Sequence, residues 1–504
     1  MASAGEVDSE FLALPLRKLA QAALRRATDF GAEHADFRLE RLRSQRLVLR
    51  DQAVVDASES DGIGFAVRVI VDGAWGFASG TALTVDEAVR VAEQAVRLAQ
   101  VAKPLAVEPI SLAAEPVYDD QIWVSAYDVD PFAIDVGAKV ELLADWSRRL
   151  VEHAAVEHVA ASVHQVRENK FYADSHGTTT TQQRVRLNPV VEIHGADRST
   201  GVVDSMRSIA PPAGRGWEYL AGVGYDWDAE LAALPGYLHD KLSAPSVEAG
   251  TYDLVVDPSN LWLTIHESIG HATELDRALG YEANYAGTSF ASVEKLGNLK
   301  YGSKCLNVTG DRIVEHGLST IGYDDDGVAG QQWDLVKDGV LVGYQTDRSI
   351  AARMGWERSN GCAYADSPQH IPIQRMANVS LQPGDEPLST DDLVRRVDRG
   401  VYIVGDRSWS IDMQRYNFQF TGQRFFEIRD GAIQGQLRDV AYQATTIDFW
   451  GAMEAVGGPE TWVLGGAFNC GKAQPGQVAA VSHGCPSALF RDIRILNTND
   501  ERGQ

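Results

Sequence analysis

The stretch TYDLVVDPSNLWLTIHESIGHATELDRALG, residues 251–280, decides the fold predicted for the second half of this chain. The apolar run TYDLVVD predicts a strand, and a helical pattern of apolar residues begins after Pro258-Ser259-Asn260. The rest of this half consists mainly of short β-like runs. Two of them, VKDGVLVGY and FEIRDGAIQG, predict hairpins with turns at Asp338-Gly339 and Asp430-Gly431. We therefore expect a mostly antiparallel β domain that carries a short helix.

The first half predicts a mixed α and β domain, which makes the whole chain α+β. Apolar residues recur at helical spacing over 14–28, 85–100 and 134–153, and strands are expected over 157–195. GIGFAVRVIVDGAWGFASG, residues 62–80, predicts a hairpin with a turn at Asp72-Gly73. Because the pattern breaks around residues 242–245, we predict a boundary near residue 247, with domains over 1–247 and 248–504.

Composition excludes several classes of function. The formal charge of −24 and pI near 4.9 argue against binding to nucleic acid or to an anionic membrane surface, since both need a basic face. Only four cysteines occur in 504 residues, which fits a reducing compartment. The start MASAGEVDSE lacks the pattern of a signal peptide, and no apolar run is long enough to span a bilayer. We expect a cytoplasmic protein.

The hexapeptide HESIGH, residues 266–271, is the main candidate for chemistry. Its pattern is H-E-x-x-x-H, one residue longer than the H-E-x-x-H of many zinc peptidases. On a regular helix His266 and His271 would point about 140° apart, because five residues turn a helix through about 500°. A shared metal therefore requires a local distortion such as a π-bulge, for which Gly270 supplies backbone freedom. The alternative is an ordinary helix whose two histidines form separate hydrogen bonds.

A catalytic zinc site needs three protein ligands and one open position, so a third ligand must come from elsewhere. Cys470, in LGGAFNCGKAQPGQ, is predicted to lie on a loop as an accessible thiol, and as a thiolate it would complete a His2Cys set that suits zinc. Cys485 competes with it, although its apolar neighbours favour a buried structural thiol. Cys305 and Cys362 have no ligand-like spacing.

Carboxylates near the histidines have separate expected roles. If a metal is bound, Glu267 can act as the general base toward water, and the expected reaction is hydrolysis of an amide. Glu274 is either a hydrogen-bond partner of a ligand histidine or a surface charge. The acidic run Tyr323-Asp324-Asp325-Asp326-Gly327 does not fit a calcium loop, and we expect a solvated turn.

The chain resembles the TldD/PmbA peptidases, and specifically the TldD-type member that keeps the metal motif. The shared segments are HESIGH, NCGK, DGIGFAVRV, GAWGFAS, YDDDGVAGQ, VLVGYQTDR, ARMG and PIQRMANVSLQPGD, which follow the family's order over nearly the whole chain. The chain departs from the family at VGDRSWSIDMQRYNFQF, residues 404–420, where the family often has a glycine-rich stretch, and at Cys485, where it has small residues. The first departure concerns the shape of the substrate channel.

The resemblance implies a metallopeptidase with zinc on His266, His271 and Cys470, and Glu267 as the catalytic residue. It also implies a two-domain subunit that forms a homodimer, or a heterodimer with a paralogue lacking HExxxH, around a chamber for unfolded or flexible peptides. Family substrates are held as an added β-strand. Two alternatives remain: a non-catalytic partner that binds extended peptides, and a cysteine peptidase that uses Cys470.

Overall fold

The N-terminal domain is built on one long, curved sheet. The computed structural model describes residues 5–501, so the first four and last three residues of the predicted domains lie outside it. The seven strands follow the order β3-β2-β1-β5-β6-β4, with β7 paired to β6. Their bounds are β1 His34–Arg50, β2 Ala53–Val71, β3 Ala74–Gly80, β4 Gln121–Val124, β5 His158–Asp174, β6 Thr179–Asp197 and β7 Val202–Arg207. The hairpin predicted at Asp72-Gly73 is confirmed by the pairing of β2 with β3.

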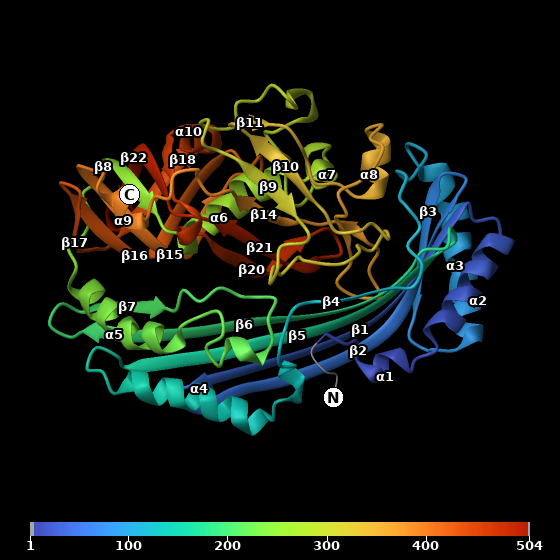
Figure 1. Ribbon diagram of the computed structural model, residues 1–504, viewed down its shortest axis with the longest axis horizontal. Coiled ribbons are helices and arrows are strands. Elements are labelled where there is room, and N and C mark those ends of the chain that lie inside the picture. Colours follow the sequence, from blue (N-terminus) through green and yellow to red (C-terminus); the bar gives the residue numbers. More distant parts are fainter. Residues whose placement is uncertain (1–4, 502–504) are drawn as a thin grey trace.

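Helices pack at both ends of this sheet. α2 (Leu16–Asp29) and α3 (Val85–Ala102) lie beside β3, whereas α4 (Val136–Val151) and α5 (Trp227–Ser243) lie near β7 (Figure 1). Each pair buries its own apolar cluster against the sheet, so the strands are held from both ends. The predicted helices over 14–28, 85–100 and 134–153 are thus confirmed. Among residues 5–501, no helix is both long and apolar enough to cross a membrane.

The C-terminal domain is mostly antiparallel. Its main sheet follows the order β15-β8-β22-β18-β16-β17, with β19 paired to β22, and β8 runs parallel to β15. These strands are β8 Gly250–Val256, β15 Arg399–Ile411, β16 Asn417–Arg429, β17 Ala432–Leu437, β18 Val440–Thr445, β19 Met453–Val456 and β22 Ala488–Asn497. Smaller sheets contain β9 Val308–Asp311, β10 Gln332–Lys337, β11 Val340–Leu341, β12 Ala363–Tyr364, β13 Ile373–Gln374, β14 Asn378–Leu381, β20 Val463–Lys472 and β21 Gln477–Cys485. Both predicted Asp-Gly hairpins and the α+β class are confirmed.

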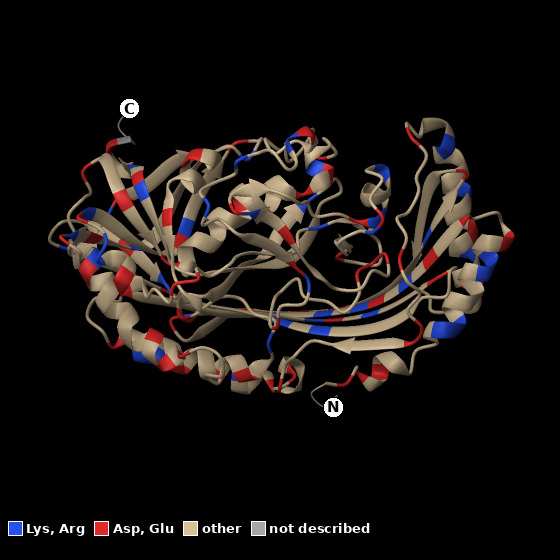
Figure 2. Cartoon of the chain, turned by 45° about the horizontal axis from the view of Figure 1, so that its top comes forward, with Lys and Arg blue, Asp and Glu red and all other residues tan. Residues whose placement is uncertain are grey.

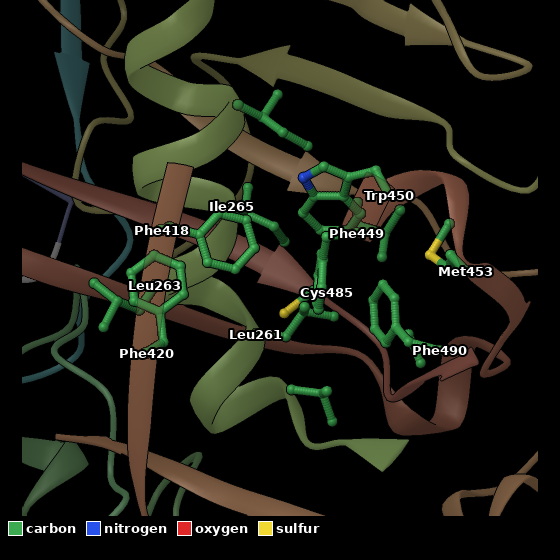
Figure 3. Packing of buried hydrophobic residues seen from close by; sticks show 14 of the residues in the cluster. Leu261, Leu263, Ile265, Phe418, Phe420, Phe449, Trp450, Met453, Cys485 and Phe490 are labelled. Atoms are coloured by element: carbon green, nitrogen blue, oxygen red, sulfur yellow. The ribbon is translucent and has the colours of Figure 1, made fainter. Parts of the chain in front are cut away.

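The helix α6 (Pro258–Ile265) is held in the core of this domain. It begins at Pro258, slightly earlier than predicted, because the side chain of Asp257 accepts a hydrogen bond from the Ser259 amide. Leu261 and Ile265 are fully buried among the aromatic residues of β16, β22 and the short α10 (Thr446–Gly451) (Figure 3). This packing fixes where the chain leaves the helix, which is at His266.

The two domains meet through buried charges. Asp325 and Asp326 lie below 6% exposure, and they pair with Lys170 at 2.8 Å and with Arg68 at 2.6 Å. Both cations stand on the long strands that pass beneath the C-terminal domain, where basic and acidic residues alternate (Figure 2). The expectation of a solvated turn at residues 323–327 was therefore wrong. The turn is buried because cations of the other domain pair with Asp325 and Asp326 and backbone amides donate to Asp324. The boundary near residue 247 stays a prediction.

Candidate metal centre

The two histidines of HESIGH lie on one side of the chain because the helix widens between them. After α6, residues His266–Gly270 form a π-helical turn in which the His271 amide donates to the His266 carbonyl, five residues back. The ring centroids of the two histidines are consequently 4.7 Å apart. The predicted distortion is confirmed, but the reason for Gly270 is different. Its φ of −52° is ordinary, and a Cβ there would lie 2.6 Å from Sδ of Met376.

Cys470 joins the histidines from a remote strand. It lies on β20, where the pairing with β21 is irregular between Ala467 and Cys470, as in a β-bulge. Its Sγ is 3.7 Å from Nε2 of His271, and one donor atom from each of the three residues lies within 4.8 Å of the others. The loop prediction was wrong because the glycines pair in a strand, and the thiol is only 7% exposed. The three predicted ligands are nevertheless brought together.

His483, which no local sequence signal marks as a functional residue, orients His266. Nδ1 of His483 lies 2.9 Å from the carbonyl oxygen of Val379, which can only accept, so Nδ1 carries the proton. Nε2 of His483 is then an acceptor, and Nδ1 of His266, 2.7 Å away, must donate to it. This relay leaves the Nε2 lone pair of His266 free for a metal, as in known sites where a second residue fixes the tautomer.

Glu274 orients His271 in the same way. Its Oε2 accepts a hydrogen bond of 2.8 Å from Nδ1 of His271, which leaves Nε2 of that ring free on the side of Cys470. Glu274 is only 1% exposed, and burial would raise its pKa, but Lys472, His271 and Arg277 hold that pKa well below the usual value. Of the two roles considered for Glu274, the structure therefore supports the partner of a ligand histidine.

Glu267 faces the same space and has its own partner. One carboxylate oxygen accepts a hydrogen bond of 2.5 Å from Nη1 of Arg415. Burial would raise the pKa of Glu267, but the nearby His266, His271 and Arg415 lower it, so the group is a carboxylate at neutral pH. Arg415 lies between β15 and β16, and no local sequence signal marks it as a neighbour of Glu267.

His266, Glu267, His271, Arg415 and Cys470 line a cavity of about 540 Å³, to which both domains contribute residues. The N-terminal domain contributes Asn188 and Val190 of β6 and the segment 207–212, and the C-terminal domain contributes the metal-centre residues, Trp262 and one side of β20. Cys485 is outside this cavity, with its Sγ 3.5 Å from the carbonyl oxygen of Pro258. Burial raises its pKa well above the usual value, which agrees with the predicted structural role.

The donor set fits zinc. Two imidazole nitrogens and one sulfur converge, and zinc is commonly held by such nitrogen and sulfur ligands. Burial would raise the pKa of Cys470, but His271 and Arg375 lower it, which favours the thiolate needed in a metal site.

Comparisons with known proteins find metallopeptidases similar to both domains of this chain. Family models match residues 249–497, as the PmbA/TldA metallopeptidase C-terminal domain, and residues 35–99, as domain 1 of the same family. A metalloprotease of Methanothermobacter thermautotrophicus is 27% identical over 98% of this chain and 100% of its own length. A zinc metalloprotease TldD homologue of Saccharolobus solfataricus is 23% identical, over 94% of this chain and 98% of its own.

Solved structures share the fold. TldE from Thermococcus kodakarensis superimposes with a TM-score of 0.70 and 16% identity, and covers 95% of this chain and 99% of its own. A putative modulator of DNA gyrase from Thermotoga maritima gives a TM-score of 0.75 at 14% identity, with 95% and 100% coverage. The family models, which match segments of both domains, show that the chain belongs to the TldD/PmbA family of metallopeptidases.

Proposed function

We propose that this chain is a zinc-dependent peptidase in which His266, His271 and Cys470 hold the metal and Glu267 is the general base. The observation that carries the proposal is the convergence of three donors, each with its coordinating atom free, beside a buried carboxylate. Two histidines oriented by separate partners would have little reason to converge on a thiol without an ion to share.

Zinc, when bound, supplies a Lewis acid that polarises a peptide carbonyl and makes water acidic near pH 7. The chain provides the remaining functions. Glu267 accepts the proton of the attacking water and can deliver it to the leaving amine. The cavity shields this exchange from bulk solvent, and His483 and Glu274 keep both imidazoles in the tautomer that can bind metal.

We further propose that the substrates are unfolded or flexible peptides. Among the described strands, β20 pairs only with β21, so its other edge is open, and Gly465, Gly466 and Ala467 of this strand line the cavity. Small residues on an open strand edge suit an extended peptide that adds as a further strand. A homodimer, or a heterodimer with a paralogue lacking HExxxH, would complete the chamber, and the four free cysteines support a cytoplasmic location.

A cysteine peptidase is the second candidate, because Cys470, His271 and Glu274 lie in the order nucleophile, base and orienting carboxylate. It leaves His266, its relay to His483 and Glu267 without a function. A non-catalytic peptide-binding partner, the third possibility, leaves the same residues unexplained. The zinc peptidase accounts for all of them.

Metal analysis with peptide hydrolysis tests the proposal. We expect about one zinc per purified chain, loss of that zinc in Cys470→Ser, and full zinc in the control Cys305→Ser, whose thiol is exposed. Glu267→Gln should keep zinc but cleave an unfolded peptide about 100- to 10,000-fold more slowly. Full hydrolysis by a chelator-treated, metal-free chain would overturn the zinc assignment, and full activity of Glu267→Gln in that state would favour the cysteine peptidase.

A further inference from the structure

The backbone holds Arg415 in a fixed position at the cavity. It lies at the turn between β15 and β16, with a φ of 65°. The Asp412 side chain accepts hydrogen bonds from the amides of Gln414 and Tyr416, and Thr446 donates to the Arg415 carbonyl at 2.7 Å. The turn therefore presents the Arg415 side chain without depending on the pair with Glu267.

The guanidinium of Arg415 has unused donors. Nη1 donates to Glu267, whereas Nη2 reaches only the Ala286 carbonyl, at 3.5 Å. Nε is buried and has no hydrogen-bond partner within the described chain. The Nε and Nη2 edge of a guanidinium is the edge that binds a carboxylate with two parallel hydrogen bonds. Arg415 lines the cavity and 13% of its side-chain surface is exposed, so a ligand in the cavity can contact this side chain.

The charge of the cavity differs from that of the whole chain. The chain carries −24, yet three arginines and two carboxylates line the cavity, before any contribution from a metal. Arg207 pairs with Asp406 and Arg407 pairs with Asp204, each at 2.7 Å. The partner of Arg415 is Glu267, which must also interact with water in the proposed reaction. The charge of Glu267 is therefore not used by Arg415 alone. A second anion at Arg415 would compensate this buried cation during turnover.

We propose that Arg415 recognises a carboxylate of the substrate, so that the enzyme prefers peptides with an acidic side chain or a free C-terminal carboxylate near the scissile bond. This inference rests on the proposed peptidase function. The two sources of the carboxylate have the same chemistry and differ in position along the peptide.

The test compares matched peptides on the zinc-loaded chain. One pair differs by Asp or Asn beside the cleaved bond, and a second pair differs by a free or amidated C-terminus close to that bond. Arg415→Gln should lower kcat/KM for the carboxylate member of the recognised pair about 10- to 100-fold more than for its neutral analogue. Arg415→Lys, which keeps the charge but lacks the fork, should give an intermediate ratio.

Controls separate recognition from damage to the site. The positive φ at residue 415 strains the backbone for Lys and Gln as it does for Arg, so these substitutions add no new strain. A second control, Arg97→Gln, removes one exposed charge on α3. Arg97→Gln should leave the peptide ratios unchanged, and all variants should bind zinc as the wild type does. An equal loss for both members of each pair would overturn the inference, since Arg415 would then act on Glu267 or on every substrate alike.

Binding to the metal-free chain provides a second readout. A fluorescent peptide with a carboxylate should bind the wild type more tightly than its neutral analogue, as measured by anisotropy, and Arg415→Gln should abolish that difference. No preference in the wild type would overturn the inference. If no peptide is cleaved by the zinc-loaded chain, the proposed function fails, while this binding measurement still decides the role of Arg415.

Discussion

Two clusters in this molecule each contain a buried lysine paired with carboxylates, but the carboxylates of the two clusters have different further contacts. At the domain interface, Lys170 donates to both carboxylate oxygens of Asp325 and to the Ala365 carbonyl, at 2.8 to 3.0 Å. Beside the metal centre, Lys472 donates to Glu274 at 3.1 Å and to Asp276 at 2.8 Å. Both lysines are nearly inaccessible.

The difference lies in the next residue. Glu274 also accepts a hydrogen bond from His271, whose other nitrogen faces the cavity. Asp325 instead pairs with cations on the strands of the other domain. Burial of charge therefore does not by itself identify a site, since structural ion pairs perturb pKa values as strongly as catalytic groups do. This site is identified by hydrogen bonds that orient the imidazole of His271 so that its Nε2 lone pair faces a cavity.

Replacing Lys170 or Lys472 with Met should have the largest effect and should distinguish the two clusters. Lys170→Met and Lys472→Met each remove one cation from a group of buried carboxylates, which should lower the free energy of unfolding by about 3–5 kcal/mol. Only Lys472→Met should also weaken zinc binding, by about 10- to 100-fold, because Glu274 then orients His271 less well. Urea unfolding and competition with a chromophoric chelator measure the two effects. An equal loss of zinc affinity in Lys170→Met would contradict the distinction.

The interface cluster should give stability a pH dependence. Burial raises the pKa of Glu40 from 4.5 to about 7, although Arg38 and Lys170 oppose the shift and Asp325 and Glu168 add to it. Because the folded state holds this proton more tightly, the stabilisation is complete below pH 4.5 and is lost as pH rises through 7. The contribution should be about 3 kcal/mol.

Glu40→Gln, which cannot lose a proton, tests this dependence. Urea unfolding measures the stability of wild type and variant at pH 5 and pH 8. Between these two pH values the wild type should lose more stability than the variant does. Parallel pH profiles for the two proteins would show that Glu40 does not titrate in this range. Zinc affinity should be the same in both proteins, since Glu40 is not among the residues that line the cavity.

The smallest effect concerns the histidine relay. His483→Leu removes the acceptor for Nδ1 of His266, so zinc affinity should fall about 10- to 100-fold, or about 1.4 to 2.7 kcal/mol. His483→Gln offers an amide oxygen to the same proton and should lose less. Chelator competition measures both variants. Unchanged affinity in His483→Leu would mean that His266 keeps its tautomer without this partner.

Local features of the fold were predictable. The three Asp-Gly turns are correct because both residues of each turn adopt a positive φ, which Asp and Gly tolerate better than most residues. The distortion within HESIGH was also predictable, since five-residue spacing admits a shared ion only if the helix widens.

Contacts between distant segments were not predictable. His483 lies 217 residues from His266, and Arg415 lies 148 residues from Glu267, so no local pattern links either pair. The two errors have different origins. Cys470 was expected on a loop because its neighbours are small, but these residues form a hairpin with the next strand, β21. The acidic turn was expected in solvent because of its composition, but cations on distant strands determine its environment.

The π-helical turn in HESIGH shows how a helix can accommodate an inserted residue. An extra residue inserted into a helix normally rotates everything beyond it by about 100°, which would separate two side chains that work together. Here the widened turn absorbs the additional residue, so the two imidazoles remain adjacent. A helix can therefore accommodate one additional residue while two such imidazoles stay adjacent, and a pattern search restricted to the shorter spacing passes over this chain.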